Sequence, residues 1–307
     1  MNVATERVVA IMSNIEKFDI SYSEFHRLDI LSKIKGTGRS NKFSCGPVSL
    51  TILIFSLLVN WMHNLDSECF VSLPDDASRL FRRPENCHFC EGFSEVDKIM
   101  NVSPRVMLQK YIKHSHPVVI TDGASNWAAK SQFNFNFFKQ IFDSVDINET
   151  KDRNCQFFPY ETEFRSLHEV FNMTPERALM KEGEIPWYIG WNNCNDAVGR
   201  YLKQFYEKPY FFKNLTEHIS LSWVFMGSPG YGAQMHIDNV HYPSWQAQLS
   251  GRKLWKLAPP PECHYSCEPF EVVVEPGEII VLDTNKWYHQ TFVQPGDISI
   301  TIGSEFD

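Results

Sequence analysis

The sequence predicts a mainly β (α+β) domain of the jelly-roll type with flanking helices, preceded by one N-terminal transmembrane helix. Three observations lead to this fold class. Beyond Leu221 the chain consists of short apolar runs between glycine and proline turns, residues 103–208 carry helical patterns, and residues 43–65 contain no Asp, Glu, Lys or Arg. With 307 residues, 43% hydrophobic and 14% aromatic, the chain can form one sizeable globular core.

The C-terminal part contains eight strand-like runs. They are separated by turns such as SPGYG, SGR, EPGE and QPGD, at the spacing that is typical of a small barrel or jelly roll. We expect strands over residues 222–228, 233–238, 245–250, 253–258, 271–275, 278–283, 291–293 and 299–303.

Helical patterns dominate the preceding part. The clearest covers residues 103–114, with Ser103 as N-cap, Pro104 at the first position and an apolar stripe on one face. That stripe consists of Val106, Leu108, Tyr111 and Ile112. We expect further helices over 133–142, 164–171 and 196–208, and buried strands over 116–124 and 186–191.

The uncharged run at residues 43–65 is long enough to cross a bilayer as a helix, and a buried core helix is the alternative. Basic residues precede this run and acidic ones follow it, so the positive-inside rule predicts a type II signal anchor. Residues 1–42 would form a cytosolic tail, and everything after residue 65 would lie in the lumen of the endoplasmic reticulum or Golgi. The flanking charges are Arg27, Lys33, Lys35, Arg39 and Lys42 before the run, and Asp66, Glu68, Asp75 and Asp76 after it.

Cysteines and glycosylation sequons fit a lumenal position. Seven of the eight cysteines and four N-x-[ST] sequons lie beyond the apolar run. Asn148 and Asn214 are the better acceptors, because proline follows the sequons of Asn101 and Asn172. The protein is therefore expected to be a glycoprotein with disulfide bonds.

The C-x-x-C motif of Cys87 and Cys90 is open to three interpretations. It is a redox pair, half of a zinc site with Cys263 and Cys267, or two half-cystines of separate disulfides. An oxidising lumen favours the last. We expect residues 66–100 to form a cysteine-containing stem that is stapled by disulfides and has no core of its own.

The charge balance argues against a nucleic-acid partner. The chain has 29 basic and 37 acidic residues, a net charge of −8, and no basic surface is indicated. This weakens any interpretation that requires a chromatin substrate.

Two histidines and one aspartate form a candidate metal site. In a strand, His236 and Asp238 point to the same face, and His289 follows another strand-like run some fifty residues later. Two histidines and one carboxylate are the facial triad that holds non-haem Fe(II) and leaves positions open for chemistry. A single His-x-Asp tripeptide is a weak signal, and the surrounding strands and turns strengthen it.

From about Asn101 to Asp307 the chain resembles a jumonji C (JmjC) domain of the cupin-like 2-oxoglutarate oxygenases. It is most similar to the branch that includes the bifunctional arginine demethylase and lysyl hydroxylase. The resemblance implies a double-stranded β-helix, the cupin fold, over residues 101–307. It is carried in order by HPVVITDGASNW, WYIGW, EKPYFF, WVFMGSPGYGAQMHID, SWQAQLSGRKLWKLAPP, PGEIIVLDTNKWYHQT and SITIGSEF.

The resemblance also implies which residues bind the cofactors. Fe(II) would be held by the triad, and the co-substrate 2-oxoglutarate by Lys253, Thr301 and Gln246, which stands where the related branch has asparagine. Strand alternation independently places Thr301 on the face opposite the isoleucines 298, 300 and 302, and Lys253 on the face opposite Lys256. The remaining candidates, His241 and His264, have no partner at ligand spacing and are interpreted as loop histidines.

These features predict an Fe(II)/2-oxoglutarate-dependent dioxygenase, a hydroxylase or demethylase of a protein or peptide in the secretory pathway. Two alternatives remain open. One is a membrane-tethered binding protein that keeps the fold without turnover. The other is a cupin-like enzyme that uses its metal without 2-oxoglutarate. The residue selected on the substrate does not follow from the sequence.

Overall fold

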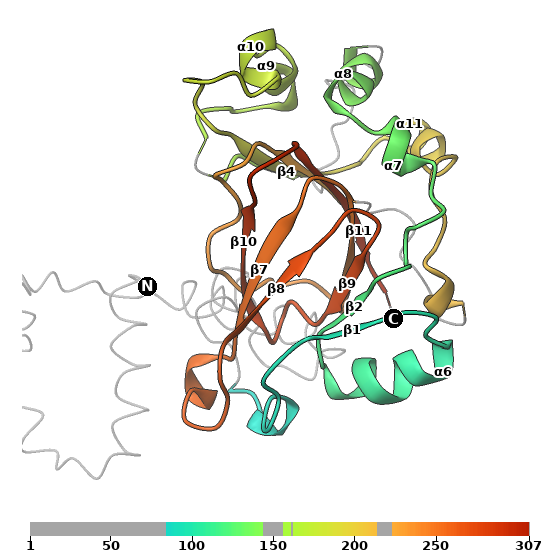
Figure 1. Ribbon diagram of the computed structural model, residues 1–307, viewed down its shortest axis with the longest axis vertical. Coiled ribbons are helices and arrows are strands. Elements are labelled where there is room, and N and C mark those ends of the chain that lie inside the picture. The colour runs from blue at the N-terminus through green and yellow to red at the C-terminus, as the bar shows by residue number, and fades with distance from the viewer. Residues whose placement is uncertain (1–83, 144–155, 161, 214–222, 307) are drawn as a thin grey trace, which may run out of the picture. The chain divides into compact units, whose positions relative to one another are not determined.

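The computed structural model describes residues 84–143, 156–160, 162–213 and 223–306 (Figure 1). The predicted cytosolic tail, the apolar run at 43–65, and the sequons of Asn148 and Asn214 lie outside these residues. No helix within them is long and apolar enough to span a membrane.

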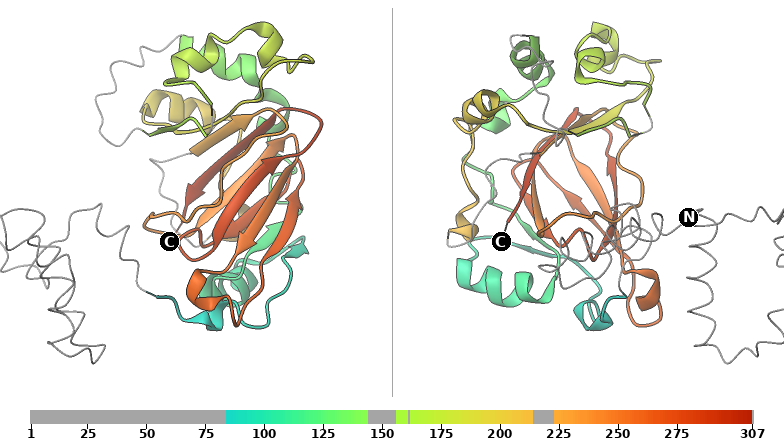
Figure 2. Two further views of the ribbon diagram at one scale, coloured as in Figure 1. Left: turned by 90° about the vertical axis from the view of Figure 1, so that its left-hand side faces the viewer. Right: turned by 180° about the vertical axis from the view of Figure 1, so that it is seen from behind.

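Two β-sheets face one another and form a barrel (Figures 1 and 2). The larger sheet has the strand order β1-β2-β9-β6-β11-β5-β4-β3, and the smaller has the order β10-β7-β8. The strands are β1 (Asp97–Ile99), β2 (Val118–Ile120), β3 (Phe157–Phe158), β4 (Tyr188–Asn192), β5 (Trp223–Gly227), β6 (Ser244–Ser250), β7 (Lys253–Ala258), β8 (Phe270–Val274), β9 (Ile279–Leu282), β10 (Tyr288–Val293) and β11 (Ser299–Glu305). This arrangement confirms the prediction of a mainly β, jelly-roll domain.

Helices cover the outer face of the larger sheet. Those in Figure 1 are α6 (Pro104–Val106), α7 (Ala129–Gln132), α8 (Phe135–Asp143), α9 (Leu167–Phe171), α10 (Pro175–Ala178) and α11 (Asp196–Leu202). Helix α6 continues as a π-helical turn at Met107–Tyr111 and a 3-10 turn at Ile112–His114, so the predicted helix over 103–114 is present. Ser103 caps it, as expected, by accepting a hydrogen bond from the Val106 N–H.

The apolar stripe predicted for this helix was partly wrong. Met107 is fully buried and Tyr111 nearly so, whereas Val106 is 44% exposed. Met107 and Tyr111 are four residues apart and define the buried face, so Val106, one residue before Met107, points about 100° away from it. The predicted helices over 164–171 and 196–208 are shorter in the structure, at α9 and α11.

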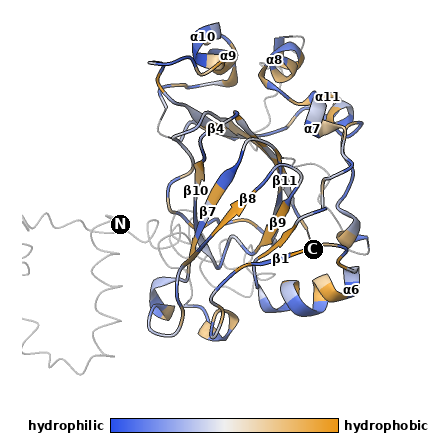
Figure 3. Ribbon diagram, in the orientation of Figure 1, coloured by the Kyte–Doolittle hydropathy of each residue, from blue (hydrophilic) through white to orange (hydrophobic). Residues whose placement is uncertain are grey.

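The large sheet separates the two larger of three hydrophobic clusters in the described residues. The outer core fills the space between this sheet and the helices, and contains the alternate strand residues Ile189, Trp245, Ile300 and Ile302. The inner core contains residues of both sheets, such as Ile280 of β9 with Trp255 of β7, and therefore fills one end of the barrel. Hydrophobic residues accordingly concentrate on the strands, and the connecting loops are mostly hydrophilic (Figure 3). The other end of the barrel, called the free end below, contains the smaller third cluster of Tyr188, Ala233 and Val293, which borders the cavity.

Two disulfides fasten the segment before β1 to the loop between β7 and β8. Cys87 is bonded to Cys263 and Cys90 to Cys267. The two cysteines of the C-x-x-C motif thus have separate partners, which confirms the interpretation as half-cystines over a redox pair or a zinc site. The described part of the predicted stem, from residue 84, packs against the barrel, because Phe89 belongs to the inner core and β1 pairs with β2.

Candidate metal centre

The backbone brings His236 and His289 together. The segment from Tyr231 to Asp238 runs along β10, and His236 and His289 exchange two backbone hydrogen bonds with N–O distances of 3.0 and 2.8 Å. Gly232 permits this close approach, since a Cβ there would lie 1.9 Å from the Thr291 carbonyl oxygen. The imidazole ring centroids are 4.2 Å apart.

The prediction of a regular strand over residues 233–238 was wrong. Ala233 pairs with Thr291 and His236 with His289, so three steps along this segment match only two along β10. The extra residue is a bulge, which re-aims the side chains that follow it. The His236 Nδ1 lies 2.6 Å from the Gln234 carbonyl oxygen within the bulge. His236 and Asp238 therefore converge through this irregularity and not through strand alternation.

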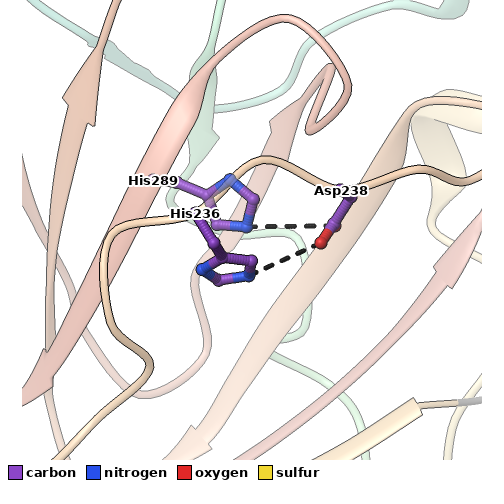
Figure 4. A group of neighbouring side chains, drawn as sticks. All are labelled: His236, Asp238 and His289. Atoms are coloured by element: carbon purple, nitrogen blue, oxygen red, sulfur yellow. Dashed lines mark ion pairs between the residues drawn. The ribbon is translucent and has the colours of Figure 1, made fainter. Parts of the chain in front are cut away.

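Asp238 completes the triad (Figure 4). Its Oδ1 lies 3.5 Å from the His236 Nε2, and its Oδ2 lies 3.9 Å from the His289 Nε2. Two ligands that each sit about 2.1 Å from one ion at right angles are about 3 Å apart. A small inward movement of the side chains would accommodate a metal ion, and the donor set of two imidazoles and one carboxylate fits Fe(II).

Hydrogen bonds orient both imidazoles for metal binding. The Nδ1 of His289 lies 3.0 Å from the Trp287 carbonyl oxygen, just as the Nδ1 of His236 lies near the Gln234 carbonyl oxygen. If each Nδ1 carries the proton, each Nε2 is left as a lone-pair donor that points toward Asp238. The polypeptide itself thus selects the tautomer that a metal requires.

Burial and the interactions among the three ligands shift their pKa values in different directions. Burial lowers the pKa of His289 to about 4, so this imidazole is neutral at pH 7. For Asp238, burial would raise the pKa, but the hydrogen bond with His236 leads the interactions that outweigh burial and lower it. For His236, burial would lower the pKa, and the hydrogen bond with Asp238 raises it.

The triad opens into a cavity of about 460 Å³ at the free end of the barrel. His289 is 4% exposed, whereas the side chains of His236 and Asp238 are 35% and 32% exposed. A metal ion would therefore be held from one side by protein and face the cavity on the other. The lining residues include Tyr160, Tyr188, Phe225, Gln246, Trp255 and Thr291.

Lys253 and Thr301 meet in the interior, as strand alternation predicted. The Nζ of Lys253 donates a 2.6 Å hydrogen bond to the Thr301 Oγ1, and neither side chain is accessible to solvent by more than 1%. Lys253 has no carboxylate partner among the described residues, and burial lowers its pKa to about 7. Lys256 points outward and pairs with Glu271 at 2.8 Å.

The cavity wall stands between Lys253 and the metal ligands. The rings of Tyr188 and Phe225 lie 5.4 and 5.6 Å from the Lys253 Nζ and line the cavity, whereas Lys253 and Thr301 are not among its lining residues. A carboxylate that reaches Lys253 from the cavity therefore requires one of these rings to shift. The buried amine without a counter-ion nevertheless fits an anionic ligand.

Gln246 and Gln248 both project from β6 toward the interior. Gln246, a predicted 2-oxoglutarate ligand, lines the cavity, whereas Gln248 was not predicted as a site residue. The Oε1 of Gln248 accepts a 3.0 Å hydrogen bond from the Thr301 hydroxyl, and its Nε2 donates to the Ser299 Oγ at 2.9 Å. Its position two residues from Gln246 on the same strand face was the signal that would have identified it.

Tyr188 and Thr291 are further cavity residues that the sequence analysis did not single out. Tyr188 lies on β4, the predicted strand WYIGW, and Thr291 lies on β10 two residues after His289. Both face the cavity by the same alternation that places their neighbours outward. The group of possible metal ligands in the described residues contains neither His241 nor His264.

Comparison with known proteins places this barrel in a family. The model of the cupin-like domain matches residues 104–266, more than half of the chain. The chain belongs to the cupin-like domain family. This result supports the resemblance to JmjC domains at the level of the cupin-like fold.

Curated relatives of this cupin-like chain include named oxygenases and demethylases. The arginine-specific demethylase JMJ20 of Arabidopsis thaliana is 24% identical over 247 residues, covering 62% of this chain and 53% of its own. The 2-oxoglutarate and iron-dependent oxygenase JMJD4 of Danio rerio is 30% identical over 106 residues, 25% of each chain. The bifunctional arginine demethylase and lysyl-hydroxylase psr-1 of Caenorhabditis elegans is 24% identical over 152 residues, 47% of this chain and 36% of its own. The cupin-like chain thus spans about half or less of the length of these relatives.

Among solved structures, the cupin-like chain is similar to YcfD, a ribosomal oxygenase from Escherichia coli. The likeness covers 67% of this chain and 51% of that chain, with 14% sequence identity and a TM-score of 0.43.

Proposed function

We propose that the chain is an Fe(II)- and 2-oxoglutarate-dependent oxygenase that hydroxylates, or demethylates by hydroxylation, a side chain of a protein or peptide. The observation that carries the proposal is the triad of His236, Asp238 and His289, which is held from one side and open to a cavity on the other. Relatives whose names state the same cofactors or the same class of reaction support it.

Each part of the site would have a distinct role. The triad would hold Fe(II), which with 2-oxoglutarate and O₂ supplies the oxidising power to break a substrate C–H bond. The chain itself contributes the tautomers of both imidazoles, the neutral state of His289 and a wall of aromatic side chains that limits access of water. A general base is not required for this chemistry.

Lys253 would anchor the distal carboxylate of 2-oxoglutarate, with Thr301 beside it. A buried carboxylate requires a cation and hydrogen-bond donors, and Lys253 is a buried amine whose one hydrogen-bond partner among the described residues is the Thr301 hydroxyl. Gln246 would donate its amide to the same ligand from the cavity wall.

The substrate would be a protein or peptide of the secretory pathway. This part of the proposal depends on the apolar run at 43–65 with its charge asymmetry, and the disulfides at Cys87 and Cys90 support an oxidising compartment. The membrane would then act as a tether that keeps the barrel near its substrates.

The test is turnover by the purified chain with Fe(II), ascorbate and 2-oxoglutarate, measured as succinate and followed by a mass-spectrometric search for a +16 Da product among secretory peptides. Succinate that depends on both cofactors supports the proposal. Metal and 2-oxoglutarate binding without succinate would favour the inactive binding protein. Metal binding without 2-oxoglutarate binding would favour a metal-dependent enzyme of another kind.

A further inference from the structure

The segment that carries Asp238 leaves the barrel wall directly after His236. Up to that residue it is held by backbone bonds to β10. Beyond it, the described residues hold the segment through the Asp238 N–H, which donates to the Thr284 carbonyl at 2.9 Å, and the Val240 N–H, which donates to the Asn285 Oδ1 at 2.9 Å. The Glu305 carboxylate is the next contact, at the N–H groups of residues 241 and 242.

Thr284 and Asn285 belong to one tight turn between β9 and β10. The N–H groups of Lys286 and Trp287 both donate to the Asp283 carbonyl, and the Asn285 N–H donates to the Asp283 Oδ1 at 3.2 Å. The Trp287 indole donates to the Ser115 carbonyl at 2.8 Å and fixes the far end of the turn. The turn is therefore anchored independently of the segment that it grips.

We propose that Asn285 is a positioning residue for the metal ligand Asp238. The proposal depends on the triad binding a metal ion, as the proposed function requires. The turn accepts a hydrogen bond from the Asp238 N–H through the Thr284 carbonyl. It accepts a second one from the Val240 N–H through the Asn285 side chain. Holding both ends fixes the backbone on each side of the Asp238 Cα and aims its carboxylate at both imidazoles. His289 emerges from the same turn, so one element sets two of the three ligands.

The energetic argument concerns preorganisation. Asp238 lies on an irregular segment that lacks a sheet ladder of its own, so the Val240 bond to Asn285 restrains rotations that would carry the carboxylate away. Loss of groups that orient a metal ligand typically weakens metal affinity about 10- to 100-fold. The same loss should leave the 2-oxoglutarate anchor unaffected, because Lys253 and Thr301 lie on β7 and β11.

The experiment compares two variants of equal size. Asn285→Leu removes the acceptor, and Asn285→Asp keeps an acceptor oxygen at the same reach. Lys286→Ala is the control, because the Lys286 Nζ contacts Ser115 and Asp283 and, among the described residues, contacts none of residues 238–240. Lys286→Ala also changes the net charge by −1, as Asn285→Asp does. A gain in metal affinity that came from net charge alone would therefore occur in both variants.

Mn(II) serves as the probe for the purified chain, titrated by the loss of the electron paramagnetic resonance signal of the free ion. We expect Asn285→Leu to raise the Kd for Mn(II) about 10- to 100-fold. Asn285→Asp and Lys286→Ala should remain within about threefold of wild type, and the KM for 2-oxoglutarate at saturating metal should not change in any variant.

Three outcomes would overturn the inference. An Asn285→Leu protein with wild-type Mn(II) affinity would show that the grip is not needed. Asn285→Leu and Asn285→Asp could lose Mn(II) affinity equally, or Lys286→Ala could lose as much as Asn285→Leu. Either result would show that only the integrity of the turn matters. If the wild-type chain itself bound no Mn(II) and an Asp238→Ala variant behaved identically, the proposed metal site would fail and this inference with it.

Discussion

Lys253 and Thr301 come from different sheets, yet their side chains meet at 2.6 Å between Nζ and Oγ1 in the interior of the barrel. The contact joins the small sheet to the large one. Lys253 is buried there, and no carboxylate among the described residues pairs with its amine. A buried cation of this kind is costly unless an anion joins it. The pair therefore supports the proposal that an anionic ligand binds here.

The first prediction concerns Lys253→Ala. Removing one partner of a buried charge pair costs roughly 3 to 5 kcal/mol, so the KM for 2-oxoglutarate should rise at least about 100-fold. Initial rates of succinate formation over a range of 2-oxoglutarate concentrations measure this. The matched control is Lys256→Ala on the same strand, whose side chain points outward to Glu271 and should leave the KM unchanged. A normal KM in Lys253→Ala would place the anchor elsewhere.

The second prediction is a pH dependence of 2-oxoglutarate capture. Burial lowers the pKa of Lys253 to about 7, below its ordinary value of 10.5, so the amine is charged below pH 7 and neutral above it. Only the charged form attracts the carboxylate. The kcat/KM for 2-oxoglutarate should therefore fall about tenfold per pH unit above about pH 7, because kcat/KM reports the free enzyme. A flat profile between pH 7 and 9 would contradict the assignment.

The sequence predicted these two residues because β7 and β11 are regular strands. Alternation alone places Lys253 and Thr301 inward and Lys256 outward, and the structure agrees. Alternation failed at His236 and Asp238, because a bulge is set by the pairing of Ala233 with Thr291, which no local pattern encodes.

Two further features of the structure could not be predicted from the sequence. The grip of Asn285 on Val240 joins residues 45 positions apart, and polar residues in turns are common without such a role. The partners of Cys87 and Cys90 were left open for the same reason, since connectivity follows from the fold and not from spacing.

The third prediction concerns the metal ligands. Asp238→Ala and His289→Ala should each abolish metal retention and turnover of 2-oxoglutarate, because two remaining ligands do not hold Fe(II) against exchange. Metal content after gel filtration, measured by mass spectrometry, is the assay. His241→Ala is the control, since this exposed loop histidine lies outside the triad. Full metal content in either triad variant would refute the site.

The fourth prediction concerns the disulfides. Replacing Cys90 and Cys267 by serine opens a bridge of sequence separation 177, which should lower the free energy of unfolding by about 2 to 5 kcal/mol. The bridge also holds Phe89 against Trp287, where the rings are 5.1 Å apart, so the inner core should loosen. Urea unfolding measures the change. The comparison is the wild-type chain with both disulfides reduced. Its free energy of unfolding should be no higher than that of the variant.

The fifth prediction joins topology with glycosylation. If residues 43–65 anchor the chain with its barrel in the lumen, carbohydrate should be attached at Asn148 and Asn214. The sequons of Asn101 and Asn172 should stay unmodified, because proline follows the Ser103 and Thr174 of these sequons. The Ser103 Oγ and the Thr174 Oγ1 each accept a 3.3 Å hydrogen bond as a helix N-cap, with proline next in the chain.

Synthesis of the full chain in microsomes, followed by protease and glycosidase treatment, distinguishes these cases. We expect the C-terminal domain to be protected in sealed vesicles and its mobility to shift on deglycosylation. The Asn148→Gln and Asn214→Gln double variant should lose that shift, and the Asn101→Gln and Asn172→Gln double variant should keep it. Digestion of the domain in sealed vesicles without any shift would reject the lumenal topology. Because the triad does not depend on the compartment, the same active site would then meet cytosolic or nuclear substrates, and the search for its product would move there.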